Sequence, residues 1–595
     1  MRVHGLHLTF TWATLLILFE PYHDMTESCF HDNMDGNVDT SAVEELHVHR
    51  GSNRRLKRLT QEVYKPLRIK TLYSLEHLST KEQFALKQVL ERAVRKITSL
   101  LSVIRNDGLL LLPRSACPAV FREGINKGKC AMIQSGYTGE YCMDRFKIPS
   151  AHLEGFAIYN MTDTEPYKIY MKNGTGLRNT DFVLYVTSKM TNLCNPFKTS
   201  ALAYAAYCKL DSTARPIAGH VNFCPRTVKT QKFDEELLYK TAVHELFHAL
   251  GFSNKLFDKF RKCDEVGVCE PWPQPIVRPV DGVMRLVTGA VVRQMSKHFN
   301  CSSESDFGGP LEVEGDSVTS HWDGLLMHSS IMGSKEQKPY QTLIDPISLA
   351  VFEDTGWYKV NYSQADKFMW GQDKGCSFGL PNFCKQHEGI CLQNVTGCHH
   401  LRLSKARCNV NTKIPSSCGV FAADQIPCFI TPVNSTSFDD ETLSSSSRCF
   451  LSSLRPAYSY SSEKNASFLN LIGKCYERKC EKDQYYLRVN GGDWLLCVPE
   501  SYIQVQGFEG NILCANYDIV CSDFIHPEPQ LEFVASSTPV NLLTISQDIR
   551  TPWNRIEASV TYSLLEGGAR PAKSFFCPVA LVIGIIASIF VDFLS

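Results

Sequence analysis

The sequence has no excess of charge of either sign. Its 62 Lys and Arg residues balance its 62 Asp and Glu residues, and no long basic block is present. Electrostatic binding to nucleic acid requires cationic side chains that neutralise phosphates, so we expect no nucleic-acid partner. At 595 residues the chain is too long for one hydrophobic core, and we expect two or three domains.

Long apolar runs are also scarce, and the two that we find lie at the ends of the chain. The first, "LHLTFTWATLLILF", follows Arg2 and is short for a membrane span. It predicts a signal peptide over residues 1–22 and passage through the secretory pathway.

The second run, "FFCPVALVIGIIASIFV", forms most of a hydrophobic tail over residues 575–595. At about 17 residues it is at the lower limit for a spanning helix. Arg570 and Lys573 precede it, which is opposite to the preference of a transmembrane anchor. Small residues at 567–569 favour a glycosylphosphatidylinositol (GPI) signal; a transmembrane tail and an incidental apolar run are the alternatives. Either anchor would hold the protein at the extracellular face of the membrane.

Cysteine, in contrast, is abundant. The chain has 24 cysteines spread over nearly its whole length, which is typical of secreted proteins held by disulfides. Seven N-glycosylation sequons agree with an extracellular location. Their asparagines are Asn160, Asn173, Asn300, Asn361, Asn394, Asn434 and Asn465.

Residues 23–58 form a polar segment that has too few large apolar side chains to build a core. The segment contains one cysteine, Cys29, and ends in the run RLKR, which closes at Arg58. Secretory convertases cut after runs of this kind, although a solvated basic turn is an alternative. Because the run follows a signal peptide, we predict a pro-segment that is removed by cleavage after Arg58.

The spacing of apolar residues predicts an α+β fold for the region that follows. A long amphipathic helix begins at Ser79, where Ser79 and Glu82 have capping-box spacing. Strands are predicted at 181–188 and 217–224, and a helix from about 233 to 250 is apolar on most of its circumference. The apolar face of the first helix comprises Phe84, Val89, Leu90, Ala93, Val94, Ile97 and Leu101.

Beyond Tyr358 the composition predicts a disulfide-rich, mainly irregular or β domain. If Cys29 and Cys577 leave with the pro-segment and the tail, 22 of the 24 cysteines remain, nine before Tyr358 and 13 after it. Both numbers are odd, so at least one disulfide must join the two lobes if every cysteine pairs within the chain. After the pro-segment we predict two segments of the first lobe, 59–252 and 253–358. The disulfide-rich domain follows over 359–526, then a stalk over 527–574 and the tail.

The stretch "TAVHELFHALGFSN", residues 241–254, has the pattern of a metal site. On a helix, His244 and His248 present two imidazoles on one face, which suits a zinc ion. Glu245 lies beside that face, where a general base for a zinc-activated water is needed. Gly251 can adopt the positive φ that ends a helix. The alternative is a buried helix whose histidines only form hydrogen bonds in the core.

A catalytic zinc site needs three protein ligands and one open position, so a third ligand is required. One large group of zinc peptidases has a histidine where this chain has Asn254, and asparagine is a poor zinc ligand. The stretch "SHWDGLLMHSSIMGS" from residue 320 offers His321 and His328 as candidates, and a methionine at Met332.

In these features the sequence resembles the leishmanolysin family of metzincin metallopeptidases, in which an insertion separates the glycine from the third histidine. The resemblance runs from about Leu67 to about Cys521. The matching pieces are HELFHALG at 244–251, Ser-His-Trp at 320–322, the methionine after it, VFEDTGWYKVNYS at 351–363 and WGQDKGC at 370–376.

The resemblance implies a metzincin-type catalytic domain with one zinc ion per chain, bound by His244, His248 and His321. It also implies that Glu245 is the general base and that Met332 lies in the turn beneath the metal. His328 stays as a rival third ligand, although the family pattern places the histidine before a tryptophan.

The resemblance also gives Cys29 a role, because "CFHD" looks like the pro-segment motif whose thiolate occupies the open zinc position. We therefore expect a zinc endopeptidase of the cell surface or extracellular space, made as a latent proform and acting on protein or peptide substrates. The substrate would add a strand to an edge of the sheet, and we expect residues 217–224 in that wall. A non-catalytic adhesion or receptor-binding protein with the same fold is the alternative, and the family is also associated with adhesion and matrix degradation.

Overall fold

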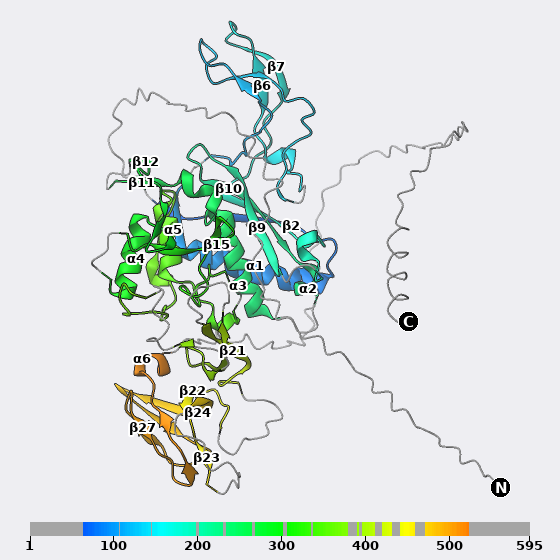
Figure 1. Cartoon of the computed structure of the whole chain (residues 1–595). Helices are drawn as coiled ribbons and strands as arrows, with labels where there is room; N and C mark the ends of the chain where they lie inside the picture. Colours follow the sequence, from blue (N-terminus) through cyan, green and yellow to red (C-terminus); the bar gives the residue numbers. More distant parts are fainter. Residues whose placement is uncertain are drawn as a thin grey trace, which may run out of the picture. The chain divides into compact units, whose positions relative to one another are not determined.

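The computed structural model describes residues 64–522, apart from short stretches within that range (Figure 1). The stretches that are not described are 106–107, 144–145, 198–200, 230–233, 265–267, 302–305, 335–336, 379–388, 392–394, 411–418, 431–440 and 458–470. The signal peptide, pro-segment, stalk and tail also lie outside the described residues. None of the helices within the described part is long and apolar enough to cross a membrane.

The first long helix, α1 (Thr80–Leu100), begins where the sequence predicts. The Ser79 hydroxyl accepts from the backbone N–H of Glu82, and the Glu82 carboxylate accepts from the backbone N–H of Ser79, so the capping box is present. Phe84 was expected on the buried face but is 58% exposed. It lies about 160° around the helix from Leu86, which is buried. The buried face comprises Leu86, Val89, Leu90, Ala93, Ile97 and Leu100.

The central sheet has the strand order β2–β8–β10–β9. Its strands are β2 (Ile69–Ser74), β8 (Phe182–Thr187), β10 (Pro216–Phe223) and β9 (Ala203–Leu210). The first three run parallel, and β9 is antiparallel to β10. Both predicted strands are therefore present, but the prediction that 217–224 forms the substrate wall is wrong. Strand β10 has a neighbour on each side and is buried throughout, whereas β2 and β9 are the edge strands.

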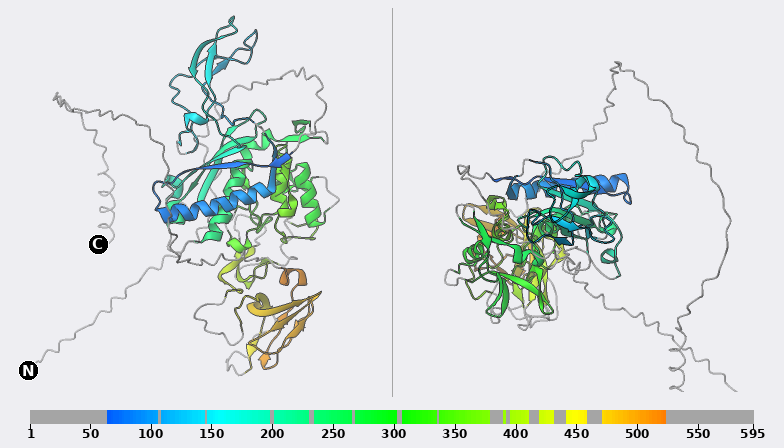
Figure 2. Two further views of the ribbon diagram at one scale, coloured as in Figure 1. Left: turned by 180° about the vertical axis from the view of Figure 1, so that it is seen from behind. Right: turned by 90° about the horizontal axis from the view of Figure 1, so that it is seen from above.

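Helix α3 (Glu235–Leu250) packs against α1 and against the edge strand β9. Asp234 caps its N-terminus, where the carboxylate accepts from the backbone N–H of Leu237 at 2.9 Å. Every residue from 242 to 250 is buried, as the all-round apolar pattern predicts. Figure 2 shows α1 along its full length, beside the sheet.

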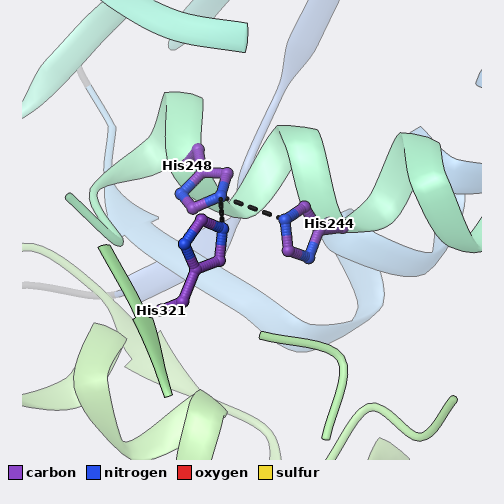
Figure 3. A group of neighbouring side chains, drawn as sticks. All are labelled: His244, His248 and His321. Atoms are coloured by element: carbon purple, nitrogen blue, oxygen red, sulfur yellow. Dashed lines mark hydrogen bonds between the residues drawn. The ribbon is translucent and has the colours of Figure 1, made fainter. Parts of the chain in front are cut away.

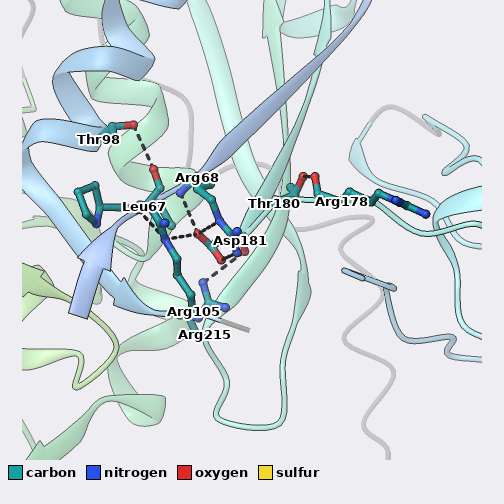
Figure 4. Close-up of polar contacts among 9 residues, drawn as sticks. Leu67, Arg68, Thr98, Arg105, Arg178, Thr180, Asp181 and Arg215 are labelled. Carbon is teal, nitrogen blue, oxygen red and sulfur yellow. Dashed lines mark hydrogen bonds and ion pairs between the residues drawn. The ribbon is translucent and has the colours of Figure 1, made fainter. Parts of the chain in front are cut away.

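A buried carboxylate, Asp181, holds the beginnings of β2 and β8 together (Figure 4). The backbone N–H and the guanidinium of Arg68 both donate to it, at 2.7 to 2.9 Å. Arg105 Nε lies 3.8 Å from the same carboxylate, and Arg215 donates to the backbone carbonyl of Asp181 at 3.3 Å. A buried charge requires partners of this kind, so these contacts fix the two parallel strands at one end of the sheet.

Short elements surround this sheet. Strands β1 (Tyr64–Pro66), β3 (Leu101–Ile104) and β17 (Lys359–Val360) form a three-stranded sheet, and α2 (Pro225–Val228) follows β10. Two hairpins pair β4 (Ala119–Val120) with β5 (Cys130–Met132), and β6 (Phe156–Tyr159) with β7 (Pro166–Met171).

The side chains of four predicted glycosylation sites are exposed, as an acceptor asparagine requires. They are Asn160, Asn173, Asn300 and Asn361. The other three, Asn394, Asn434 and Asn465, lie outside the described residues.

The segment between α3 and His321 is folded and contains a four-stranded sheet, β13–β14–β15–β16. Its last strand carries His321. The carboxylate of Asp354, on the later helix α5, accepts from the backbone N–H groups of Ala290 and Val291 at 2.9 Å and so ties α5 to α4. The elements are β11 (Arg261–Cys263), β12 (Cys269–Pro271), β13 (Val277–Val280), β14 (Val283–Leu286), α4 (Gly289–Phe299), β15 (Gly309–Glu314), β16 (Ser317–Trp322) and α5 (Pro346–Asp354).

The C-terminal lobe is mainly β, as predicted. One sheet has the order β18–β21–β20–β19, and the other has the order β26–β25–β24–β22–β29–β27. The strands are β18 (Ile390–Cys391), β19 (Thr396–Cys398), β20 (Ser404–Val410), β21 (Gly419–Pro427), β22 (Ser447–Ser452), β24 (Ile472–Glu481), β25 (Gln484–Arg488), β26 (Leu495–Cys497), β27 (Tyr502–Ile503) and β29 (Ile512–Leu513). The pair β23 (Arg455–Pro456) and β28 (Phe508–Glu509) and the helix α6 (Tyr517–Val520) complete the lobe.

Ten disulfides lie in the described residues, and one of them joins the two lobes. That bond links Cys301, after α4, to Cys376, so the link that the odd cysteine counts predict is confirmed. Cys384 and Cys418 lie outside the described residues. The other nine pairs are 117–130, 142–208, 194–224, 263–269, 391–408, 398–449, 428–475, 480–521 and 497–514.

Replacing both Cys301 and Cys376 by alanine should lower the free energy of unfolding more than replacing both Cys263 and Cys269. The first pair closes a loop of 75 residues and the second a loop of 6. Restriction of the unfolded chain predicts a loss of about 4 kcal/mol for the long loop and about 2 kcal/mol for the short one. Denaturant unfolding of the two double variants tests this, and equal losses would contradict it.

Candidate metal centre

The end of α3 positions the first two histidines of the site. His244 and His248 are one helical turn apart and both are buried. Gly251 ends the helix with φ 140°, a conformation that other residues rarely adopt. A Cβ atom at this position would also lie 3.2 Å from the ring of Trp357. The turn at Gly251 is therefore the one that the sequence predicts.

The third histidine of the site is His321, on β16. Its Nε2 lies 3.1 Å from Nε2 of His248, which in turn lies 3.1 Å from Nε2 of His244 (Figure 3). All three rings are buried, and their ring nitrogens converge on one point between α3 and β16. The structure thus brings together three side chains that are up to 77 positions apart in sequence (244 to 321).

Backbone carbonyl groups determine which nitrogen of each ring faces the centre. Nδ1 of His244 lies 2.6 Å from the carbonyl oxygen of Ile331, and Nδ1 of His248 lies 2.8 Å from that of Phe252. A carbonyl oxygen can only accept, so both Nδ1 atoms donate. In the neutral rings the lone pairs are then on the two Nε2 atoms, which point toward each other.

This arrangement fits a cation better than a hydrogen bond. Two lone pairs that face each other at 3.1 Å repel, whereas a cation between them attracts both. Nitrogens that lie 2.0 to 2.1 Å from one tetrahedral zinc ion are about 3.3 Å apart, close to the observed spacing. Three imidazoles are a common zinc donor set and leave a fourth position open. His244, His248 and His321 can therefore hold a metal ion.

Glu245 lies beside these histidines and is almost fully buried. Burial raises the pKa of its carboxyl group to about 8, while a hydrogen bond from the backbone N–H of Ala205 acts in the opposite direction. Its Oε2 atom has no hydrogen-bond partner among the described residues. A nearby cation would favour the carboxylate and lower this pKa. Ala205 lies on β9, so Glu245 connects α3 to the edge of the sheet.

Asn254 does not join the site, but it helps to place the third histidine. Its backbone N–H donates to the Ser320 hydroxyl at 3.0 Å, and its side-chain amide donates to the carbonyl of Val318 at 2.9 Å. Both acceptors lie on β16, directly before His321. The residue where some zinc peptidases have a histidine therefore holds the strand that supplies the ligand.

Met332 is fully buried in a turn that contacts both parts of the site. Its backbone carbonyl accepts from the N–H of Trp322, the residue after His321, at 2.8 Å. The residue before it, Ile331, supplies the carbonyl that binds His244 Nδ1. The methionine turn thus fixes His244 directly, through Ile331, and His321 through its neighbour Trp322.

Sequence reasoning missed a polar network that supports this turn. The carboxylate of Asp345, fully buried, accepts from the hydroxyls of Ser330 and Ser348 at 2.6 and 2.7 Å. The Ser348 hydroxyl also accepts from the indole N–H of Trp322 at 2.9 Å. Asp345 precedes a proline and caps α5, which is a recognisable helix start but gives no sign of a role at the site.

Glu312, on β15, is another acidic residue near the site that the sequence did not reveal. It accepts from the Thr319 hydroxyl at 3.3 Å and interacts electrostatically with His321. Burial raises the pKa of its carboxyl group.

His328 does not belong to the group of His244, His248 and His321. It belongs to a second group of histidines, with His399 and His400 in the C-terminal lobe. The rival assignment of His328 as third ligand is therefore not supported by its position. Cys29 and Arg58 lie outside the described residues, so latency and cleavage stay predictions.

Comparison with known proteins agrees with the geometry. Residues 143–429 match the family model described as leishmanolysin. The chain is 32% identical over 533 residues to the ciliated left-right organizer metallopeptidase of Xenopus laevis. The aligned region covers 86% of this chain and 70% of that protein. It is 30% identical to the human protein of that name, with 82% and 72% covered, and 32% identical to the leishmanolysin-like peptidase of Drosophila melanogaster, with 42% of each covered. Coverage of this extent shows that the chain belongs to the leishmanolysin family of metallopeptidases.

Proposed function

We propose that the protein is a zinc-dependent endopeptidase with a metzincin-type catalytic domain. The observation that carries the proposal is the set of three Nε2 atoms of His244, His248 and His321, with Glu245 beside them. The antiparallel edge strand β9, which packs against α3, supports the fold assignment. Peptides and proteins are the substrates of a peptidase.

His244, His248 and His321 would hold one zinc ion at this site. When bound, the ion would polarise a water molecule and the substrate carbonyl group. The role of the three histidines is to fix its position while leaving one side open. The hydrogen bonds from Nδ1 of His244 and His248 to backbone carbonyls keep these two rings oriented and increase their basicity.

Glu245 takes the proton of the attacking water and returns it to the leaving amine. Its unpartnered Oε2, within the described part of the chain, is the atom available for this transfer. The backbone N–H of Ala205, on β9, donates a hydrogen bond to the carboxylate of Glu245. The substrate would lie extended along β9, the edge of the sheet beside α3, and bind through backbone hydrogen bonds.

In this proposal the protein passes through the secretory pathway and acts at the extracellular face of the cell membrane or outside the cell. The N-terminal apolar run, the sequons and the ten disulfides support this location. The tail over 575–595 anchors it by a GPI signal or as a transmembrane segment. A GPI anchor requires that phosphatidylinositol-specific phospholipase releases the protein from cells, and retention excludes it.

The Glu245→Gln protein should cleave a peptide at least about 100-fold more slowly than wild type, because glutamine cannot accept the proton. It should keep its zinc, since Glu245 is not a ligand. The measurements are kcat/KM and metal content of the full chain after cleavage at Arg58. Glu236→Gln, an exposed change on the same helix, is the control and should leave kcat/KM near wild type. A Glu245→Gln rate within tenfold of wild type would contradict the assignment.

His321→Gln and His328→Gln should differ in their effects. Loss of a ligand removes chelator-sensitive peptide cleavage, so His321→Gln should be inactive. His328→Gln should keep most of the activity, because His328 lies in the other histidine group. Assays of both variants with and without a zinc chelator test the choice of third ligand, and the opposite pattern would reverse it.

Cys29→Ala should give a proform that cleaves peptides without removal of the pro-segment, because the thiolate that blocks the open position is missing. Arg58→Ala should keep an otherwise normal chain uncleaved and inactive. Immunoblots and peptide assays of secreted protein measure both effects. An inert, uncleaved Cys29→Ala proform would mean that Cys29 does not maintain latency.

A further inference from the structure

The second histidine group joins the catalytic part of the chain to the C-terminal lobe. His328 lies in the segment between β16 and the Met332 turn, whereas His399 and His400 lie in the turn between β19 and β20. Each of the three side chains offers a ring nitrogen, and these nitrogens lie within 4.8 Å of one another. The three rings also contact one another, with centroids 4.2 to 5.4 Å apart.

Two ring nitrogens of this group are buried and have no hydrogen-bond partner among the described residues. They are Nε2 of His399 and Nδ1 of His400. A buried polar atom without a partner costs about 1–3 kcal/mol, so its presence indicates a missing partner. Burial also lowers the pKa of both rings well below the usual value for histidine, which keeps them in the neutral form that binds metals.

The surroundings of the group hold it in place. The ring of Trp370 lies 5.1 Å from that of His328 and 5.0 Å from that of His400. Ser329, fully buried, has φ 73°, a strained conformation for serine, and places its hydroxyl 3.3 Å from His400 Nε2. Gln337 lies 3.1 Å from His328 Nδ1. Strained backbone next to unsatisfied polar atoms is more typical of a binding site than of a filled core.

We propose that His328, His399 and His400 form a second site for a transition-metal ion and that zinc is the preferred ion. Imidazole suits zinc and the neighbouring divalent metals. Among the described residues the group has three imidazoles and no carboxylate, a donor set that does not suit calcium or magnesium. The ion would give His399 Nε2 and His400 Nδ1 the partner that they lack.

Loading requires small adjustments. The three nitrogens must close from within 4.8 Å to the separation of about 3.3 Å that a tetrahedral zinc ion allows. His399 must also carry its proton on Nδ1, which gives up the 3.3 Å contact from the N–H of Leu401. The Leu401 contact is long for a hydrogen bond, so its loss costs little. His328 Nδ1 accepts from the Gln337 side-chain amide, so binding through His328 Nε2 requires this amide to turn over and the proton to move to Nδ1. The site is therefore less preformed than the first one and should bind zinc more weakly.

The function of this ion is to connect the two lobes. The Cys301–Cys376 disulfide already ties them, and the metal would add a second link between the Met332 turn region and β19–β20. Because His328 lies four residues before Met332, the ion would also stabilise the turn that supports His244. The donors of the first site, His244, His248 and His321, are complete without the second ion.

Zinc content of the full-length protein after equilibration in a zinc-buffered solution tests the proposal. Wild type should hold two ions per chain, and a His399→Gln/His400→Gln variant one. His220→Gln, which changes a buried histidine outside both groups, is the matched control and should hold two. Equal zinc in wild type and the double variant would overturn the second site.

A second measurement does not depend on whether that double variant folds. In a His244→Gln/His248→Gln/His321→Gln protein the second group is intact, so one zinc ion should stay bound. X-ray absorption at the zinc edge should then show imidazole nitrogens at about 2.0 to 2.1 Å. A folded triple variant without zinc, or with zinc bound through oxygen or sulfur alone, would rule out the second site. If the first site does not bind zinc, the triple variant should instead hold as much zinc per chain as wild type.

Discussion

Two backbone carbonyl groups decide what the centre of this protein can bind. Those of Ile331 and Phe252 take the Nδ1 protons of His244 and His248, so the lone pairs of both rings face inward. The Phe252 carbonyl reaches His248 only because Gly251 reverses the chain. The Ile331 carbonyl reaches His244 from the turn that Met332 fixes by its bond to Trp322. Each ring orientation therefore depends on a loop that lies outside the helix.

The loop at Met332 is held by groups that make no contact with the reacting atoms. Asp345, Ser330 and Ser348 form a buried network, and the indole of Trp322 donates into it. A buried network in which the groups satisfy one another is rigid, because each rearrangement would leave a polar atom without a partner. Since Trp322 follows His321 directly, the same network limits the movement of His321.

Local patterns in the sequence predict the helices and strands, although Phe84 lies outside the buried face of α1, and patterns that depend on strand order do not predict the edge of the sheet. The spacing of His244, Glu245 and His248 determines their positions on a helix, and the Ser79 capping box marked the beginning of α1. The apolar run at 217–224 revealed a buried strand but not its neighbours, so β10 was mistaken for the edge. Odd cysteine counts required a link between lobes, yet only the fold identifies Cys301 and Cys376. His399 and His400 gave no signal, because their partner lies 71 positions away (328 to 399).

Asn254 has a consequence for how this chain can vary. Its hydrogen bonds to Val318 and Ser320 hold together the two ends of the segment between α3 and His321. With both ends of a loop clamped together, added residues cost little, since the closure entropy rises only with the logarithm of loop length. Loops within residues 255–317 can therefore lengthen at little cost without displacing His321, whereas β15, which pairs with the strand of His321, must stay in place. Related chains can acquire new surfaces for recognition there and keep the same reaction centre.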